Sequence, residues 1–190
     1  MKFTKMHGAG NDYVYINGFT EKIAQEDKPE WVRRISDRHF GIGSDGVVLI
    51  KPSKKADCFM DIYNADGSRA RMCGNAVRCT AKYIYDNRIK KKSITVDTLS
   101  GIKNVEILSD CCRVNMGKPI FNGRLIPSRY GDNIVRDKIL NIDDVEYKIT
   151  CVSMGNPHCV VFFGADESLE NLDFMGFFVY NSLASKPGRE

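Results

Sequence analysis

Short apolar runs, separated by Gly, Asn, Asp and Pro, dominate the chain and are typical of strands. Polar pairs such as Ser109-Asp110 and Asp143-Asp144 fall between neighbouring runs, where they predict turns. The strands expected from this pattern cover 13–16, 47–50, 59–63, 94–96, 103–108, 113–115, 138–142 and 146–152.

Two segments have helical periodicity instead. One covers roughly 29–35 and opens with a proline, which suits the first turn of a helix. The other follows Cys73, where Val77, Ala81 and Ile84 are spaced to form one buried face. Many strands and few helices predict a mostly antiparallel α+β fold rather than repeated βαβ units.

Composition narrows the class of protein. With 190 residues, 43% of them hydrophobic, the chain can bury one sizeable core or two small ones. A net charge of +4 with scattered basic residues predicts no nucleic-acid surface. No apolar run approaches the roughly 18 residues of a membrane span, and the residues after Met1 do not form a signal peptide.

Cysteine and histidine usage points away from disulfides and metals. Seven cysteines show no Cys-x-x-Cys spacing, so neither a disulfide framework nor a zinc site is expected. Three histidines lie far apart and form no ligand motif. These observations predict a cytoplasmic protein.

A composition shift at Gly117-Lys118-Pro119 predicts a boundary between two domains, 1–117 and 118–190. A short internal sequence repeat favours two related halves of the chain. Gly10-Asn11 and Gly155-Asn156 each precede an apolar run that is expected to form a strand.

Cys73 is the leading candidate for chemistry. With Gly74 and Asn75 in the first turn of a helix, free N–H groups and the helix dipole would surround the sulfur and favour the thiolate. The same N–H groups can bind a carboxylate. A lone cysteine is more often a small buried hydrophobe, which is the interpretation we prefer for Cys58 and Cys79.

Five segments, taken in order, resemble the motifs of the diaminopimelate epimerases. The resemblance covers residue 1 to about residue 176. It implies sheets curled around a central helix, the one after Cys73, and two similar domains facing each other, the second incomplete here. The segments are Met-His-Gly-Ala-Gly-Asn-Asp at 6–12, Gly-Ile-Gly-Ser-Asp-Gly at 41–46, Asn-Ala-Asp-Gly at 64–67, Met-Cys-Gly-Asn at 72–75 and Ser-Met-Gly-Asn-Pro-His at 153–158.

The resemblance implies an isomerase that interconverts LL- and meso-diaminopimelate for lysine and peptidoglycan synthesis, without pyridoxal phosphate, another cofactor or a metal. One cysteine removes the α-proton while another delivers one to the opposite face. Cys73 matches the first, and the second belongs to a later Cys-Gly-Thr-Gly motif that these 190 residues lack. Cys151 and Cys159 are interpreted as core residues, so the chain alone is expected to be inactive.

The resemblance also assigns substrate-binding roles. Backbone N–H groups of Gly74 and Asn75 would bind the carboxylate at the reacting centre. Side-chain amides of Asn11, Asn64 and Asn156 would hold the rest of the substrate, because an amide offers both donor and acceptor. Judged without the family, each of these three Asn residues is a turn former.

Two further assignments are open at this point. His158 resembles a histidine that supports the reacting centre, and a plain loop side chain after Pro157 is an equal alternative. Gly41, Gly43 and Gly46 are expected to shape a loop.

Three rival functions remain. The chain could be another two-cysteine racemase or isomerase of the same fold, or a non-catalytic fragment that binds a carboxylate. A cysteine hydrolase would need a histidine-paired thiol, which no motif demands. The family further implies a homodimer.

Overall fold

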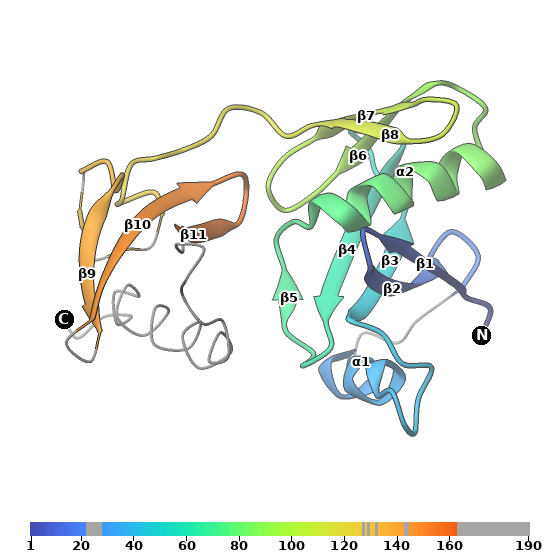
Figure 1. Ribbon diagram of the computed structural model, residues 1–190. Coiled ribbons are helices and arrows are strands. Elements are labelled where there is room, and N and C mark those ends of the chain that lie inside the picture. The colour runs from blue at the N-terminus through green and yellow to red at the C-terminus, as the bar shows by residue number, and fades with distance from the viewer. Residues whose placement is uncertain (22–27, 127, 129, 132, 143–144, 163–190) are drawn as a thin grey trace. The chain divides into compact units, whose positions relative to one another are not determined.

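The computed structural model describes residues 1–21, 28–126, 128, 130–131, 133–142 and 145–162 (Figure 1). The chain divides into two compact units, one spanning Met1–Met116 and one that begins at Gly117. The turn expected at 143–144 and the end of the expected second domain, from residue 163 on, lie outside the described residues.

The first unit contains a sheet with the strand order β1-β2-β3-β4-β6-β7-β8, and the short β5 pairs with β4. Neighbouring strands pair antiparallel except β2 with β3 and β4 with β6, which are parallel. The strands are β1 (Thr4–Gly8), β2 (Asn11–Asn17), β3 (Gly46–Lys51), β4 (Cys58–Asn64), β5 (Arg69–Ala70), β6 (Ser93–Asp97), β7 (Lys103–Ile107) and β8 (Cys112–Asn115).

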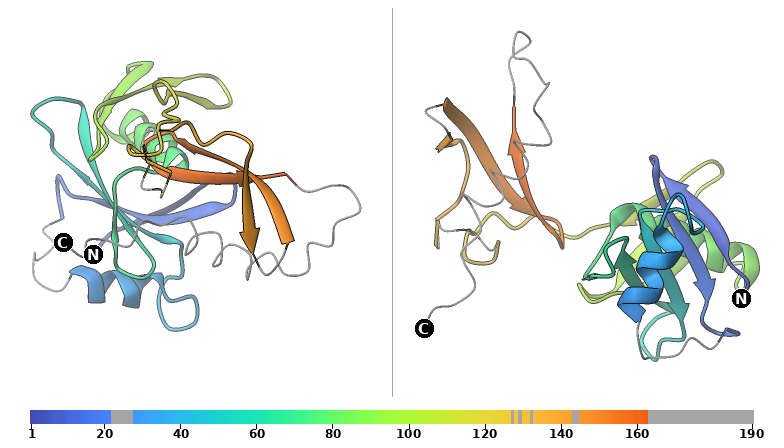
Figure 2. Two further views of the ribbon diagram at one scale, coloured as in Figure 1. Left: turned by 90° about the vertical axis from the view of Figure 1, so that its left-hand side faces the viewer. Right: turned by 90° about the horizontal axis from the view of Figure 1, so that it is seen from below.

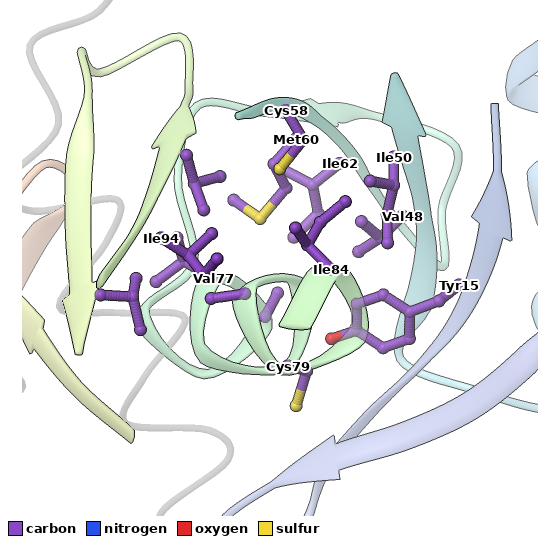
Figure 3. Close-up of a cluster of buried hydrophobic side chains, with 14 of the residues drawn as sticks. Tyr15, Val48, Ile50, Cys58, Met60, Ile62, Val77, Cys79, Ile84 and Ile94 are labelled. Atoms are coloured by element: carbon purple, nitrogen blue, oxygen red, sulfur yellow. The ribbon is translucent and has the colours of Figure 1, made fainter. Parts of the chain in front are cut away.

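The sheet curls around α2 (Gly74–Asn87). Both ends of the strand order, β1 and β8, contact this helix, as do β2, β4, β6 and β7 between them. Its buried face packs against apolar side chains of the sheet, among them Val48, Met60 and Ile94 (Figure 3). Each such fully buried side chain contributes about 1.5–3 kcal/mol of hydrophobic free energy. The expectation of a sheet wrapped around the helix after Cys73 is confirmed.

The other helix, α1 (Lys28–Ser36), covers the opposite face of β2, β3 and β4 (Figure 2). Successive side chains of a strand point to opposite faces, so Val47 and Leu49 pack with Val32 of α1, while Val48 and Ile50 face α2. A helix on each face explains why β3 is an uninterrupted apolar run rather than an alternating one.

A tight turn joins β1 to β2 and delivers Asn11 to the edge of the curled sheet. Gly8 pairs with Asn11, leaving Ala9 and Gly10 as the two loop residues with φ of 54° and 84°. Two positive φ values are those of the hairpin turn that matches the right-handed strand twist.

The second unit contains a three-stranded antiparallel sheet in the order β11-β10-β9: β9 (Lys138–Ile142), β10 (Val145–Ser153) and β11 (Pro157–Val161). Ile149 and Cys151 of β10 pack with Ile126 and Val135 in a small core. Gly155-Asn156 lies in the turn of the β10–β11 hairpin, as Gly10-Asn11 lies at the end of the β1–β2 turn.

One expectation needs correction. Gly46 does not shape a loop but is the first residue of β3. A Cβ there would lie 2.0 Å from the carbonyl oxygen of Tyr63 in β4, so close strand pairing excludes a side chain at this position. β1 and β5 were not expected from the apolar pattern.

Candidate active site

Cys73 is the N-cap of α2. It has extended backbone angles, φ −142° and ψ 120°, and its sulfur accepts a hydrogen bond from the backbone N–H of Ala76 at 3.5 Å. The side chain is half-buried. Because the helix begins at Gly74, the first-turn N–H groups lack carbonyl partners within the helix. The helix-start environment expected for this thiol is confirmed.

Asn11 provides the second polar contact of the sulfur. The Cys73 Sγ–H donates to Asn11 Oδ1 at 3.5 Å, joining residues 62 positions apart. The β1–β2 turn delivers Asn11, and α2 delivers Cys73, to this point. The sulfur therefore meets both a hydrogen-bond donor, the Ala76 N–H, and an acceptor, the Asn11 amide oxygen.

Tyr13 is buried on the face of β2 that packs against α2, beside the same thiol. Burial, reinforced by the adjacent Cys73, raises the pKa of Tyr13 above its usual range. The phenol is therefore neutral at physiological pH and keeps its hydroxyl proton. The sequence motifs did not single out this residue.

Gly74 and Asn75 form the first turn of α2, as expected, and Gly8 at the end of β1 lies close to Asn75. A Cβ at Gly8 would lie 3.1 Å from the Asn75 Cβ and 3.2 Å from its backbone oxygen. The Asn75 side-chain oxygen accepts from Arg78 Nη2 at 2.5 Å. The main-chain N–H of Asn75 lies in the first turn of the helix, where it could meet a carboxylate.

Asn64 ends β4 and is exposed. Its Nδ2 donates to Ser68 Oγ at 3.0 Å and its N–H to the Ser68 carbonyl at 2.9 Å, closing a turn. The N–H of the next residue, Ala65, donates to the Asp45 carbonyl at 2.9 Å. The turn-forming role of Asn64 is thus present, and its substrate contact stays a prediction.

A cluster of charged side chains includes Asp45, which accepts a hydrogen bond from the Asn11 amide. Arg38 Nη2 donates to Asp12 Oδ1 at 2.7 Å and to Asp45 Oδ1 at 2.8 Å, and Lys5 Nζ lies 3.1 Å from Asp12 Oδ2. The Arg38 hydrogen bond, more than the Lys5 contact, holds the pKa of Asp12 well below its usual range. Asp12 and Asp45 both lie in the quoted motifs, but only the structure joins them.

Asn156 and His158 belong to the second unit. Asn156 is half-buried in the β10–β11 turn, and His158 is exposed on β11 opposite Val152. Their place in the same site as Cys73 stays a prediction.

Cys151 is buried and Cys159 packs against the same small core, which confirms their interpretation as core residues. Burial raises the pKa of Cys159 to about 12 and also raises that of Cys151. Cys58 and Cys79 are buried in the first unit, as expected.

Among the described residues, no group of His, Cys, Asp and Glu is placed to hold a metal ion. In the same part of the chain, neither helix is long and apolar enough to cross a membrane.

Solved structures with the same fold are distant in sequence. A hydroxyproline epimerase from Agrobacterium vitis superposes with a TM-score of 0.59 at 16% identity, covering 84% of this chain and 50% of that one. A phenazine biosynthesis protein from Bacillus anthracis gives a TM-score of 0.52 at 18% identity, covering 85% and 56%. These likenesses establish the fold class expected above: a mixed, curled sheet with few helices.

Sequence relatives are much closer. Curated diaminopimelate epimerases from Acetivibrio thermocellus and Agathobacter rectalis are 49% and 52% identical, each over 85% of this chain. The chain spans 59% and 61% of their lengths. The diaminopimelate epimerase family profile matches residues 3–122, which is more than half of the chain. The chain therefore belongs to the diaminopimelate epimerase family.

Proposed function

We propose that this chain carries the Cys73 half of a diaminopimelate epimerase site, which interconverts LL- and meso-diaminopimelate for lysine and peptidoglycan synthesis. The observation that carries the proposal is the pair of contacts at the Cys73 sulfur, a donor from Ala76 and an acceptor from Asn11. The close relatives named for this activity support the choice of substrate.

The two contacts suit a group that must alternate between two protonation states. A thiolate at Cys73 is stabilised by the Ala76 N–H and the start of α2, and can accept the α-proton. A thiol is stabilised by donation to Asn11 Oδ1, and can return a proton when the reaction runs in reverse. A reversible epimerase needs both states of the same sulfur.

The substrate carboxylate would lie at the N-terminus of α2, against the N–H groups of Gly74 and Asn75. Removing the α-proton moves charge onto that carboxylate. Fixed N–H groups that point at the developing charge lower the barrier without reorganising during the step. Asn11 and Asn64 would hold other polar groups of the substrate.

The same proposal extends to the remaining assignments. Residues 1–117 would be the first epimerase domain and 118–190 part of the second, which supplies Asn156 and the supporting His158. The second acid–base group would come from the region that the relatives have and these residues do not span. The protein would be a cytoplasmic homodimer that acts on a small molecule, not on nucleic acid or membranes, and uses no cofactor.

A chimera tests the proposal. Residues 1–190 are joined to the remaining C-terminal part of the Acetivibrio thermocellus relative, and LL-diaminopimelate is followed by chiral chromatography. We expect inversion in the chimera. Cys73→Ala should abolish it and Cys73→Ser nearly so, since a hydroxyl is a far weaker acid. Cys111→Ala, at an exposed cysteine, is the matched control and should keep the rate.

Three outcomes would count against the proposal. Substantial turnover by the Cys73→Ala chimera would remove Cys73 from the mechanism. Inversion of proline or another amino acid, but not of diaminopimelate, would favour a different racemase. Binding of diaminopimelate without any α-proton exchange would favour a carboxylate-binding protein.

A further inference from the structure

We infer that Asp45 is a positioning residue of this site: its carboxylate, held by Arg38, fixes the Asn11 amide so that the amide oxygen faces the Cys73 sulfur. The importance of that sulfur rests on the proposed function. The contacts of the thiol and its reactivity towards alkylation can be measured without turnover of any substrate.

Asp45 contacts Asn11 directly. Asn11 Nδ2 donates to Asp45 Oδ2 at 3.1 Å, and the same oxygen accepts the Asp12 backbone N–H at 2.9 Å. The Asp45 N–H in turn donates to the Asp12 carbonyl at 2.8 Å. The segment before β3 is thereby tied to the start of β2, which places a carboxylate on the side of Asn11 opposite Cys73.

The chemistry of the two side chains sets the orientation of the amide. An ionised carboxylate only accepts hydrogen bonds, so it selects the NH₂ end of Asn11. The oxygen end then points at Cys73, where it accepts the S–H. The opposite orientation would place the amide oxygen against a carboxylate oxygen of Asp45, with no hydrogen between the two acceptors. In this orientation Asn11 accepts from the thiol and offers no hydrogen to the sulfur, whereas the Ala76 N–H donates to it.

Arg38 keeps Asp45 in place. Its Nη2 donates to Asp45 Oδ1 at 2.8 Å, the carboxylate oxygen that does not contact Asn11. Asp12, Lys5 and Tyr13 are the other charged or titratable groups around this contact.

The main chain of Asp45 adds a second link. Its carbonyl accepts the Ala65 N–H, which anchors the turn that begins at Asn64. One residue thus supports two of the predicted substrate ligands, Asn11 through its side chain and Asn64 through its backbone.

Thiol reactivity in the 190-residue chain tests this inference. Alkylation of Cys73 by iodoacetamide is measured by mass spectrometry across a pH series for the unsubstituted protein, Asp45→Ala and Asp45→Asn. Asp45→Ala frees the amide to turn its NH₂ towards the sulfur. The thiol then loses the amide oxygen as its acceptor, and the thiolate gains an N–H donor. A change of one hydrogen bond should lower the pH of half-maximal alkylation by roughly 0.4–1 unit, with the alkaline limiting rate unchanged.

Asp45→Asn is the matched control because it removes the charge but keeps an oxygen for Asn11 Nδ2. Its pH of half-maximal alkylation should stay close to that of the unsubstituted protein. Equal shifts in the two variants would mean that only the charge matters and would overturn the inference. A change in the alkaline limiting rate alone would indicate altered access to the thiol, and would also overturn it.

If Asp45→Ala does not fold, the unsubstituted protein supplies the decisive measurement. In an acid titration followed by NMR, the Asn11 side-chain amide resonances should move with the same midpoint as the Asp45 carboxyl carbon. Amide resonances of Asn11 that move with a different midpoint, or not at all, would refute the coupling. Epimerisation in the chimera plays no part in either readout, so the inference and the proposed function can fail separately.

Discussion

At the scale of single residues, Cys73 combines a local and a non-local environment. Its place at a helix start follows from the adjacent Gly74 and Asn75 and the apolar spacing behind them. Its contact with Asn11 does not, because the two residues lie 62 positions apart in the chain. The Asp45 and Arg38 contacts likewise join segments that no periodicity relates. The position of Cys73 at a helix start was thus predictable from the sequence, and the side-chain contacts around its sulfur were not.

The reactivity of the thiols gives a test at this scale. Cys73 should react with limiting iodoacetamide at neutral pH faster than Cys58 and Cys159. Cys73 is half-buried at a helix start, whereas burial raises the pKa of Cys58 and Cys159 to about 12 and suppresses their thiolates. Peptide mass spectrometry measures each site. Cys111 is exposed and serves as the reference for an unassisted thiol.

Preferential labelling of Cys58, Cys79 or Cys159 would contradict the assignment of Cys73. Labelling of Cys73 more slowly than Cys111 would show that access to the sulfur outweighs the helix start.

At the scale of elements, the apolar pattern located strands that have a buried face. β2, β3, β4 and β6 contain the expected runs because each buries side chains against a helix. β1 was not predicted because it is a largely exposed edge strand, whose sequence has no apolar alternation. The parallel pairings of β2 with β3 and of β4 with β6 were also out of reach, since pairing depends on long-range packing rather than on local pattern.

The contact between β1 and α2 yields a prediction at this scale. Gly8→Ala should destabilise the first unit by about 1–3 kcal/mol, because the added methyl would press on Asn75 at 3.1 Å. Urea unfolding measures the change as a lower midpoint at constant slope. Gly74→Ala is the matched control, since a Cβ there meets only the Met116 side chain at 3.8 Å or more.

The control should be neutral or slightly stabilising, because alanine replaces glycine in the first turn of a helix. A Gly8→Ala protein as stable as the unsubstituted one would show that β1 can move away from α2 at no cost.

At the scale of the whole molecule, paired carboxylates predict how stability depends on pH. The Arg38 and Lys5 contacts lower the pKa of Asp12. Burial alone would raise the pKa of Asp57, but its ion pair with Lys91 and its hydrogen bonds from Thr95 outweigh burial and lower it. A pKa lowered on folding adds stability above the unfolded value of about 3.9, and this stability is lost as the pH falls through the folded value.

The melting temperature should therefore drop as the pH falls below about 4, as followed by circular dichroism. Asp57→Asn should shrink that drop, because the amide does not titrate. An unchanged melting temperature at pH 3 would contradict the importance of these pairs for the fold.

The activity of these 190 residues alone depends on whether they contain two acid–base groups. One thiol can remove the α-proton of diaminopimelate, but inversion needs a second group to protonate the opposite face. Cys151 and Cys159 pack in the small core of the second unit, and burial raises the pKa of both. Without the partner group, the site also loses orientation and exclusion of water, of which orientation alone is worth up to roughly 7–11 kcal/mol.

We therefore expect no meaningful epimerisation by the purified chain. It is incubated with LL-diaminopimelate in deuterium oxide, with inversion followed by chiral chromatography and α-proton exchange by NMR. Slow exchange with retained configuration, lost in Cys73→Ala, would fit a site with one working base. Brisk inversion would show that another residue within these 190, or a second copy of the chain, supplies the missing acid, because a proton must reach the face that Cys73 does not serve.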